Sequence, residues 1–172
     1  MKKCLFLDRD GVIHQDIHYA HKPSQIRFEN GIFPLCRAFQ KKGYLIIVIT
    51  NQAGIARGYY NKQDVIQLHQ WMAKRFQEQR VRITAFFYCP HHPRITGSCP
   101  CRKPRPGMFR DAITKYGIDP AKSLMIGDKV TDLTAAEQSG VRHLILYRPD
   151  QPPAPSHHNR YRHCRKLSAL HP

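Results

Sequence analysis

The sequence has few acidic residues and no long uninterrupted apolar run. Its 172 residues include 12 Asp and Glu against 28 Lys and Arg, which gives a formal net charge of +16. No apolar run reaches the roughly 18 positions that a membrane-spanning helix requires. The first residues, MKKCLFLDRDG, interrupt their apolar run with charge too early for a secretory signal peptide. These absences predict a protein of the cytoplasm with no membrane partner.

The positive charge is spread along the chain, without the long blocks of like charge that are typical of nucleic-acid-binding arms. This pattern favours a solvated basic surface over a dedicated nucleic-acid-binding face. Such a surface also attracts small anionic substrates. The length and the absence of an internal repeat indicate one domain with a proper core.

The composition changes after Asp150, where the chain continues QPPAPSHHNRYRHCRKLSALHP. This segment is rich in Pro, His and Arg and has little apolar periodicity. It is not expected to bury enough apolar area to offset the entropy of ordering it. The sequence therefore predicts a body over residues 1–150 and a flexible basic tail over residues 151–172.

The body alternates short apolar runs with amphipathic segments. The runs have the length of buried parallel strands and cover residues 4–8, 44–50, 85–89, 123–128 and 143–147. The segments predict helices at about 30–42, 61–80, 107–117 and 131–139, the second with Asn61 as its N-cap. This order predicts an α/β fold, a doubly wound and mainly parallel sheet with helices on both faces. No insertion between these elements is long enough for a large cap domain.

Polar side chains gather at the ends of three predicted strands, in LDRDG (7–11), TNQAG (50–54) and IGDKVTD (126–132). Ligands of open parallel sheets bind beyond the carboxyl ends of the strands. Asp8 and Asp10 would repel each other there unless one were protonated or a cation lay between them. Asp128 and Asp132 add negative charge from another strand. One aspartate alone is often a turn residue or a helix cap, but the whole set indicates a Mg²⁺ site.

In this order, Asp8-x-Asp10, Thr50, Lys103 and Gly127-Asp128 with Asp132 resemble the motifs of the haloacid dehalogenase superfamily of phosphatases. The resemblance covers residues 1 to about 148 and implies that superfamily's Rossmann-like fold. It implies that Asp8 attacks phosphorus and that Asp10 first donates and then accepts a proton. It also implies Mg²⁺ bound by Asp8, Asp128 and the Asp10 carbonyl, with Thr50 and Lys103 on the phosphoryl oxygens.

The loop at 89–107 holds three of the six cysteines, in CPHHPRITGSCPCRKPRPGM (89–108). Cys89-x-His91 and Cys99-x-Cys101 give the three thiolates and one imidazole of a closed structural zinc site. Disulfides are disfavoured in a reducing compartment, and His92 is a rival fourth ligand. A zinc-containing nucleic-acid-binding module is a remote alternative, because the loop lacks a long helix between its ligand pairs. The predicted zinc fixes Arg102 and Lys103 over the phosphate.

Within the superfamily, PRPGM (104–108), TNQAGIARGYY (50–60) and GDKVTDLTAAEQSG (127–140) resemble the heptose 1,7-bisphosphate 7-phosphatases. The histidinol-phosphatases are the alternative, and the basic segment HQDIHYAHKPSQIRF departs from the expected pattern. The resemblance implies a monomeric phosphatase acting on a small anionic sugar phosphate. Arginine forks suit a second phosphate, although Arg57 also fits a solvated surface residue. The predicted substrate-binding residues are Asp16, Ile17, His18, Tyr19, Asn51, Gln52, Ala53, Arg57, Arg102 and Lys129.

Overall fold

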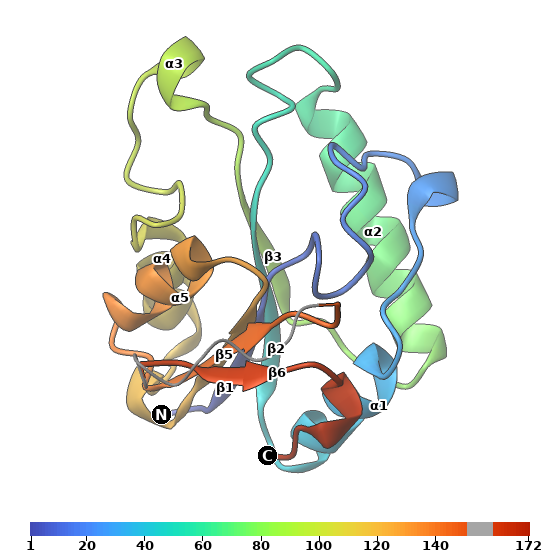
Figure 1. The fold of residues 1–172 in the computed structure, drawn as a ribbon, viewed down its shortest axis with the longest axis vertical. Coiled ribbons are helices and arrows are strands. Elements are labelled where there is room, and N and C mark those ends of the chain that lie inside the picture. The colour runs from blue at the N-terminus through green and yellow to red at the C-terminus, as the bar shows by residue number, and fades with distance from the viewer. Residues whose placement is uncertain (151–159) are drawn as a thin grey trace.

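The computed structural model (Figure 1) describes residues 1–150 and 160–172. Its centre is a six-stranded sheet in the order β3-β2-β1-β4-β5-β6, and every neighbouring pair is parallel. The strands are β1 (Cys4–Leu7), β2 (Leu45–Asn51), β3 (Ala85–Cys89), β4 (Leu124–Gly127), β5 (His143–Tyr147) and β6 (Arg162–Cys164). The chain order reverses at β1, which lies between β2 and β4. Such a reversal opens a crevice at the carboxyl ends of the strands.

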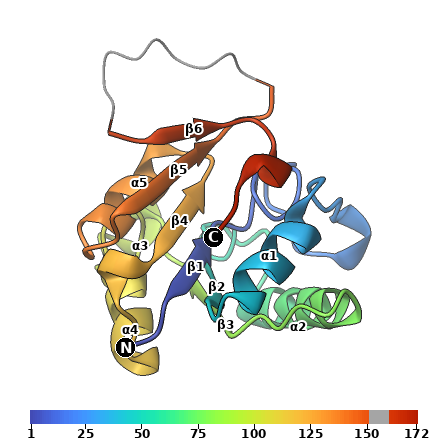
Figure 2. The ribbon, with the colours of Figure 1, turned by 90° about the horizontal axis from the view of Figure 1, so that it is seen from below.

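Helices cover both faces of the sheet, as Figure 2 shows. One face packs against α1 (Ile32–Lys41) and α2 (Lys62–Glu78), and the other packs against α4 (Gly107–Tyr116) and α5 (Val130–Glu137). Alternate residues of β1 pack into the two helix layers. Leu5 and Leu7 face α1 and α2, and Phe6 faces α4 and α5. This arrangement confirms the predicted doubly wound fold. A single helical turn, α3 (Pro93–Thr96), lies in the loop after β3.

The start of α2 shows why the sequence predicts the helices well. The side chain of Asn61 accepts a hydrogen bond from the backbone N–H of Asp64, and Asp64 accepts one from the backbone N–H of Asn61. This capping box satisfies two of the donors that a helix start leaves unpaired. Further along the helix, Val65, Leu68 and Met72 recur at helical spacing and are fully buried.

The carboxyl-terminal segment corrects the prediction of a flexible tail, as far as the structure describes it. Residues 162–164 form the edge strand β6, paired with β5, and a short 3₁₀ helix covers Leu167–Ala169. Leu167 and Leu170 are buried against the α1 side of the core. The burial of these two leucines and the pairing of β6 with β5 together favour the ordering of this segment. The part of the predicted tail at 151–159 lies outside the described residues.

Within residues 1–150 and 160–172, no inserted domain stands over the carboxyl edge of the sheet. Loops 8–31, 52–61 and 90–106 lie there instead. In the same part of the chain, no helix has both the length and the apolar character needed to cross a membrane.

Candidate active site

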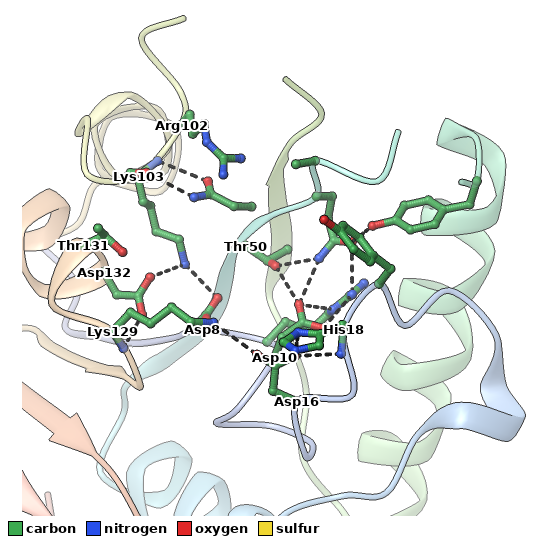
Figure 3. Close-up of a pocket in the computed structure, with 16 residues that line it drawn as sticks. Asp8, Asp10, Asp16, His18, Thr50, Arg102, Lys103, Lys129, Thr131 and Asp132 are labelled. Carbon is green, nitrogen blue, oxygen red and sulfur yellow. Dashed lines mark hydrogen bonds and ion pairs between the residues drawn. The ribbon is translucent and has the colours of Figure 1, made fainter. Parts of the chain in front are cut away.

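The candidate active site lies where three neighbouring strands end. Asp8 directly follows β1, Thr50 lies near the end of β2, and Asp128 directly follows β4. A cavity of about 330 Å³ opens at this edge (Figure 3). It is lined mainly by polar side chains from the three strand ends and the neighbouring loops, and its lining residues are Asp8, Arg9, Asp10, Asp16, His18, Tyr19, Thr50, Asn51, Gln52, Ala53, Tyr60, Arg102, Lys103, Lys129, Thr131 and Asp132.

Lys103 reaches from the 90–106 loop to the floor of this cavity. Its ammonium group lies 2.7 Å from a carboxylate oxygen of Asp8 and 2.8 Å from one of Asp132 (Figure 3). It also donates to the backbone carbonyl of Ile49 at 2.7 Å. Burial lowers the pKa of Lys103, but Asp132 and Asp8 outweigh this effect and raise it above the ordinary value. Lys103 therefore places a buried ammonium group beside the predicted nucleophile.

The carboxylates of Asp8, Asp128 and Asp132 form a cluster whose ligand atoms all lie within 4.8 Å of one another. Burial raises the pKa of Asp8 well above its usual range; Lys103 opposes this rise, and the neighbouring carboxylates add to it. Burial also raises the pKa of Asp128. One oxygen of Asp128 is buried without a hydrogen-bond partner among the described residues. A hard divalent cation fits this donor set, because it would supply the missing positive charge and a partner for that oxygen.

Gly11 lets the loop after β1 pass close to this cluster. Its backbone has φ of +85°, and a Cβ atom built there would lie 2.6 Å from a carboxylate oxygen of Asp128. Any larger residue would be strained by the backbone conformation and would also displace Asp128. The glycine of the LDRDG motif therefore lets the two acidic segments approach each other.

Asp10 lies on the opposite side of the cavity from Lys103 (Figure 3). Its Oδ2 accepts hydrogen bonds from the Thr50 hydroxyl at 3.3 Å and from the Gln52 amide at 3.0 Å. Burial alone would raise the pKa of Asp10, but Arg9 and His14 outweigh it and hold the pKa below its usual range. In the free protein Asp10 is therefore a carboxylate, and it is held by several donors.

The structure brings most of the predicted substrate-binding residues to the cavity but separates two of them. Ile17 is 43% exposed and does not line the cavity. Arg57 lines a neighbouring pocket together with Arg94 and Arg102, and its guanidinium lies 2.9 Å from Nε2 of His92. Arg102 lines both pockets.

Asn51 contacts the protein backbone at this site. Its side chain donates to the carbonyl of Lys103 and accepts from the backbone N–H of Lys103, both at 3.1 Å. On the far side of the cavity, the ammonium of Lys129 lies 3.2 Å from Asp16 and 3.3 Å from Asp128. Asn51 thus fixes the backbone from which Lys103 enters the site, and Lys129 ties the 8–31 loop to the acidic cluster.

Three residues that line the cavity were missed by the sequence analysis, namely Arg9, Tyr60 and Thr131. Arg9 is fully buried, although a charged residue at the end of a strand is usually solvated. The position of Arg9 between two aspartates was the available indication, since a buried guanidinium requires a carboxylate partner.

The predicted cysteine and histidine ligands converge at the end of β3. The Sγ atom of Cys101 lies 3.1 Å from that of Cys89 and 3.3 Å from that of Cys99. Nδ1 of His91 lies 3.4 Å from the Cys101 sulfur. All three cysteines are free thiols. His92 lies outside this cluster, where its ring accepts from the backbone N–H of Arg94 at the start of α3.

Known proteins resemble this chain in both sequence and fold. A family model described as HAD-hydrolase-like matches residues 100–156. The D-glycero-beta-D-manno-heptose-1,7-bisphosphate 7-phosphatase of Haemophilus ducreyi is 45% identical over 152 residues, which cover 86% of this chain and 84% of the relative. The protein of that name from Vibrio cholerae is 44% identical, covering 88% and 84% of the two chains. The corresponding alpha-named enzyme of Campylobacter jejuni is 43% identical, covering 84% and 81%.

A solved structure gives the same result at the level of the fold. The D,D-heptose 1,7-bisphosphate phosphatase of B. bronchiseptica, complexed with magnesium and phosphate, superposes with a TM-score of 0.83 at 31% identity. The match covers 97% of this chain and 94% of that one. Sequence identity, coverage and fold agree with the order of motifs at the carboxyl edge of the sheet. The chain is therefore a phosphatase of the haloacid dehalogenase superfamily and belongs to the family of the heptose-1,7-bisphosphate 7-phosphatases.

Proposed function

We propose that this enzyme removes the 7-phosphate of D-glycero-D-manno-heptose 1,7-bisphosphate through an aspartyl-phosphate on Asp8. The observation that carries the proposal is the arrangement of Asp8, a buried carboxylate 2.7 Å from the ammonium of Lys103 and clustered with two further carboxylates. A carboxylate attacks a phosphate only when their mutual repulsion is screened. The choice of substrate in this proposal follows the names of the similar enzymes from Haemophilus ducreyi and Vibrio cholerae.

Asp8, Asp128 and the backbone carbonyl of Asp10 are the residues proposed to hold Mg²⁺. The magnesium-containing neighbour and the unpartnered oxygen of Asp128 support this assignment. When bound, the ion would neutralise negative charge on the cluster and on the phosphate. Asp132 already accepts from Lys103 and from the backbone N–H of Lys129, so its proposed role is to hold these two residues.

The chemistry that follows uses the two aspartates in turn. An Asp8 oxygen attacks phosphorus while the bond to the sugar oxygen breaks, and Asp10 gives its proton to that oxygen. A water then attacks the aspartyl-phosphate and gives a proton to Asp10, which releases inorganic phosphate and restores the Asp8 carboxylate. The negative charge of a bound phosphate favours the protonated form of Asp10 for the first step. Lys103 and the hydroxyl of Thr50 would stabilise the phosphoryl oxygens during both steps.

The substrate-binding proposal concerns the second phosphate and the sugar. Arg102 borders both the cavity and the neighbouring pocket that contains Arg57. We propose that these two guanidiniums bind the phosphate that is not hydrolysed. Asp16, His18 and Lys129 lie across the cavity, where they can contact sugar hydroxyl groups. Histidinol phosphate, the alternative substrate, carries positive charge at its far end and would be repelled by the arginines.

The cluster of Cys89, His91, Cys99 and Cys101 is proposed to hold a structural zinc ion. The four ligand atoms lie within 4.8 Å of one another, and three thiolates with one imidazole are a usual tetrahedral zinc set. The metal would fix the loop that carries Arg102, whose guanidinium donates to the His91 carbonyl at 3.1 Å. We also propose that the enzyme acts as a monomer in the cytoplasm. Among the described residues no cysteine forms a disulfide, which fits a reducing compartment.

The test is the release of phosphate from heptose 1,7-bisphosphate and from histidinol phosphate, with Mg²⁺ present. A charge-assisted contact between an arginine and the second phosphate is worth about 1.5–3 kcal/mol. The value of kcat/KM should therefore be at least about tenfold higher for the bisphosphate than for histidinol phosphate. Arg102→Ala should remove most of that difference, whereas Asp8→Asn should abolish turnover of both substrates. A higher kcat/KM for histidinol phosphate would refute the substrate, and an active Asp8→Asn enzyme would refute the mechanism.

A further inference from the structure

Asp10 is held by a buried cluster of side chains that the proposed chemistry does not yet use. Arg9 follows Asp8 in the chain, and its side chain is fully buried. Its Nε donates to Oδ2 of Asp10 at 3.0 Å, and one of its terminal nitrogens donates to Oδ1, also at 3.0 Å. Two donors of one rigid guanidinium therefore hold both oxygens of the same carboxylate.

The guanidinium of Arg9 is in turn fixed from three directions. The terminal nitrogen that reaches Asp10 also lies 2.9 Å from the carbonyl oxygen of Ala20 and 3.0 Å from the side-chain oxygen of Gln52, so its two N–H groups are shared among three acceptors. The other terminal nitrogen of Arg9 lies 3.4 Å from Nε2 of His69, a buried residue of α2. These partners come from the loop after β1, the loop after β2 and a helix. Arg9 can move only if several elements move with it.

Gln52 completes the cluster and has no hydrogen-bonding capacity left for a substrate. Its amide nitrogen donates to Asp10 at 3.0 Å and to Thr50 at 2.8 Å. Its oxygen accepts from Arg9 and, at 2.7 Å, from the hydroxyl of Tyr60. An amide offers two donors and two acceptor positions, and all four are occupied within the protein. The predicted substrate-binding residue Gln52 therefore lines the cavity with its side-chain hydrogen bonds made to neighbouring residues, among them Asp10.

Resting on the function proposed above, we infer that Arg9 is a positioning residue that fixes the carboxylate of Asp10 for proton transfer, with Gln52 and Tyr60 completing its support. Proton transfer requires the carboxyl oxygen to lie within hydrogen-bond reach of the leaving oxygen and then of the water. A carboxylate that rotates freely meets this condition only part of the time. A lysine could supply the charge of Arg9 but not its planar fork.

The consequence can be measured because substrates differ in their need for a proton. A sugar alkoxide is a poor leaving group and needs the proton of Asp10 as its bond to phosphorus breaks. A nitrophenolate leaves without one. Both substrates need the second step, in which Asp10 accepts a proton from water. Loss of Asp10 positioning should therefore slow phosphoryl transfer from a sugar phosphate, and it should slow only the second step with p-nitrophenyl phosphate.

The experiment compares Arg9→Met with wild type on the sugar bisphosphate and on p-nitrophenyl phosphate. For Arg9→Met, kcat/KM should fall by about 100-fold on the sugar phosphate, within the usual contribution of general acid catalysis. On the aryl ester kcat/KM should change little, and rapid mixing should show a burst of about one nitrophenolate per enzyme before slow turnover. Asp10→Asn should show the same pattern, and Arg9→Lys should fall between Arg9→Met and wild type.

The control is Leu68→Ala, which removes a buried side chain of α2 outside this cluster and should affect the two substrates equally. Equal losses for Arg9→Met on both substrates would show a structural role only and would overturn the inference. If Arg9→Met does not fold, Gln52→Met and Tyr60→Phe serve instead, and the absence of any leaving-group preference in both would likewise overturn it. Equal losses for Asp10→Asn would instead refute the proposed acid role of Asp10.

Discussion

The substitution Lys103→Met tests how far a single buried ammonium holds the acidic cluster together. The side chain of Lys103 is only 2% exposed, and it pairs with Asp8 at 2.7 Å and with Asp132 at 2.8 Å. Met has a similar length and fills the same space without charge. The variant therefore keeps the packing and leaves two buried carboxylates without their cation.

The expected loss of stability is large. Removal of one partner from a buried ion pair typically costs about 3–5 kcal/mol, because the remaining charge stays buried and unpaired. In a chain of this size, each kcal/mol lowers the melting temperature by about 2–4 °C, so the expected decrease is about 6–20 °C. The matched control is Lys129→Met. Lys129 also lies beside a carboxylate of the cluster, but its side chain is 55% exposed, and its ion pairs should contribute less than about 1 kcal/mol.

The assay is urea denaturation followed by circular dichroism, without Mg²⁺ and then with it. Without Mg²⁺ the Lys103→Met enzyme should be less stable than Lys129→Met by at least about 2 kcal/mol. Added Mg²⁺ should raise the free energy of unfolding more for Lys103→Met than for wild type, because the ion supplies positive charge that the variant lacks. A Lys103→Met enzyme as stable as wild type without metal would refute the electrostatic reasoning. Equal effects of Mg²⁺ on the two proteins would refute the position proposed for the ion.

Three further predictions concern the loop, the pH dependence and the carboxyl terminus. Cys101→Ala should abolish near-stoichiometric zinc in elemental analysis and raise KM more than it lowers kcat, whereas Cys36→Ala should retain the zinc; a zinc-free wild type would contradict the assignment. Burial lowers the pKa of His69 to about 3, so the unfolded chain binds its proton first as the pH falls below about 6.5, and stability decreases. That decrease should amount to about 2 kcal/mol at pH 5 and should be absent in His69→Gln, as measured by urea denaturation at several pH values. Leu167→Ala should destabilise the protein by about 2–4 kcal/mol in the same assay, and a loss below about 0.5 kcal/mol would place the segment outside the core.

The fold could be predicted because its strands and helices carry strong local patterns. Five strands are nearly continuous apolar runs, and the helices show apolar spacing with a capping box at Asn61. The edge strand β6 was missed because it spans only Arg162–Cys164, and its sequence has no apolar run. Its order comes from pairing with β5 and from Leu167 and Leu170, which reach a layer built by distant residues. Such a tertiary effect is invisible in local composition.

The candidate site, like the fold, could be predicted from the sequence only in part. Asp8, Thr50 and Asp128 could be placed from the sequence, because each stands at the end of a recognisable strand and parallel strands end at one edge. The part played by Arg9 could not, because its burial depends on Gln52, which lies 43 positions away. A charged residue is normally expected to be exposed to solvent. Only the three-dimensional contacts show that the guanidinium of Arg9 is enclosed.

The order of the elements also explains why the proposed zinc site should influence substrate binding more than the chemical step. Asn51 and Cys89 are register partners at the ends of β2 and β3, so one strand pair anchors two points of the loop. At the first point Cys89 belongs to the cluster of cysteines and His91, and at the second the side chain of Asn51 holds the backbone of Lys103 through two hydrogen bonds. Loss of the metal would free the residues between these points, including Arg102, while Asn51 and the buried ammonium still fix Lys103. The phosphate that is hydrolysed would therefore keep its contact with Lys103, and the phosphate that is not hydrolysed would lose its contact with Arg102.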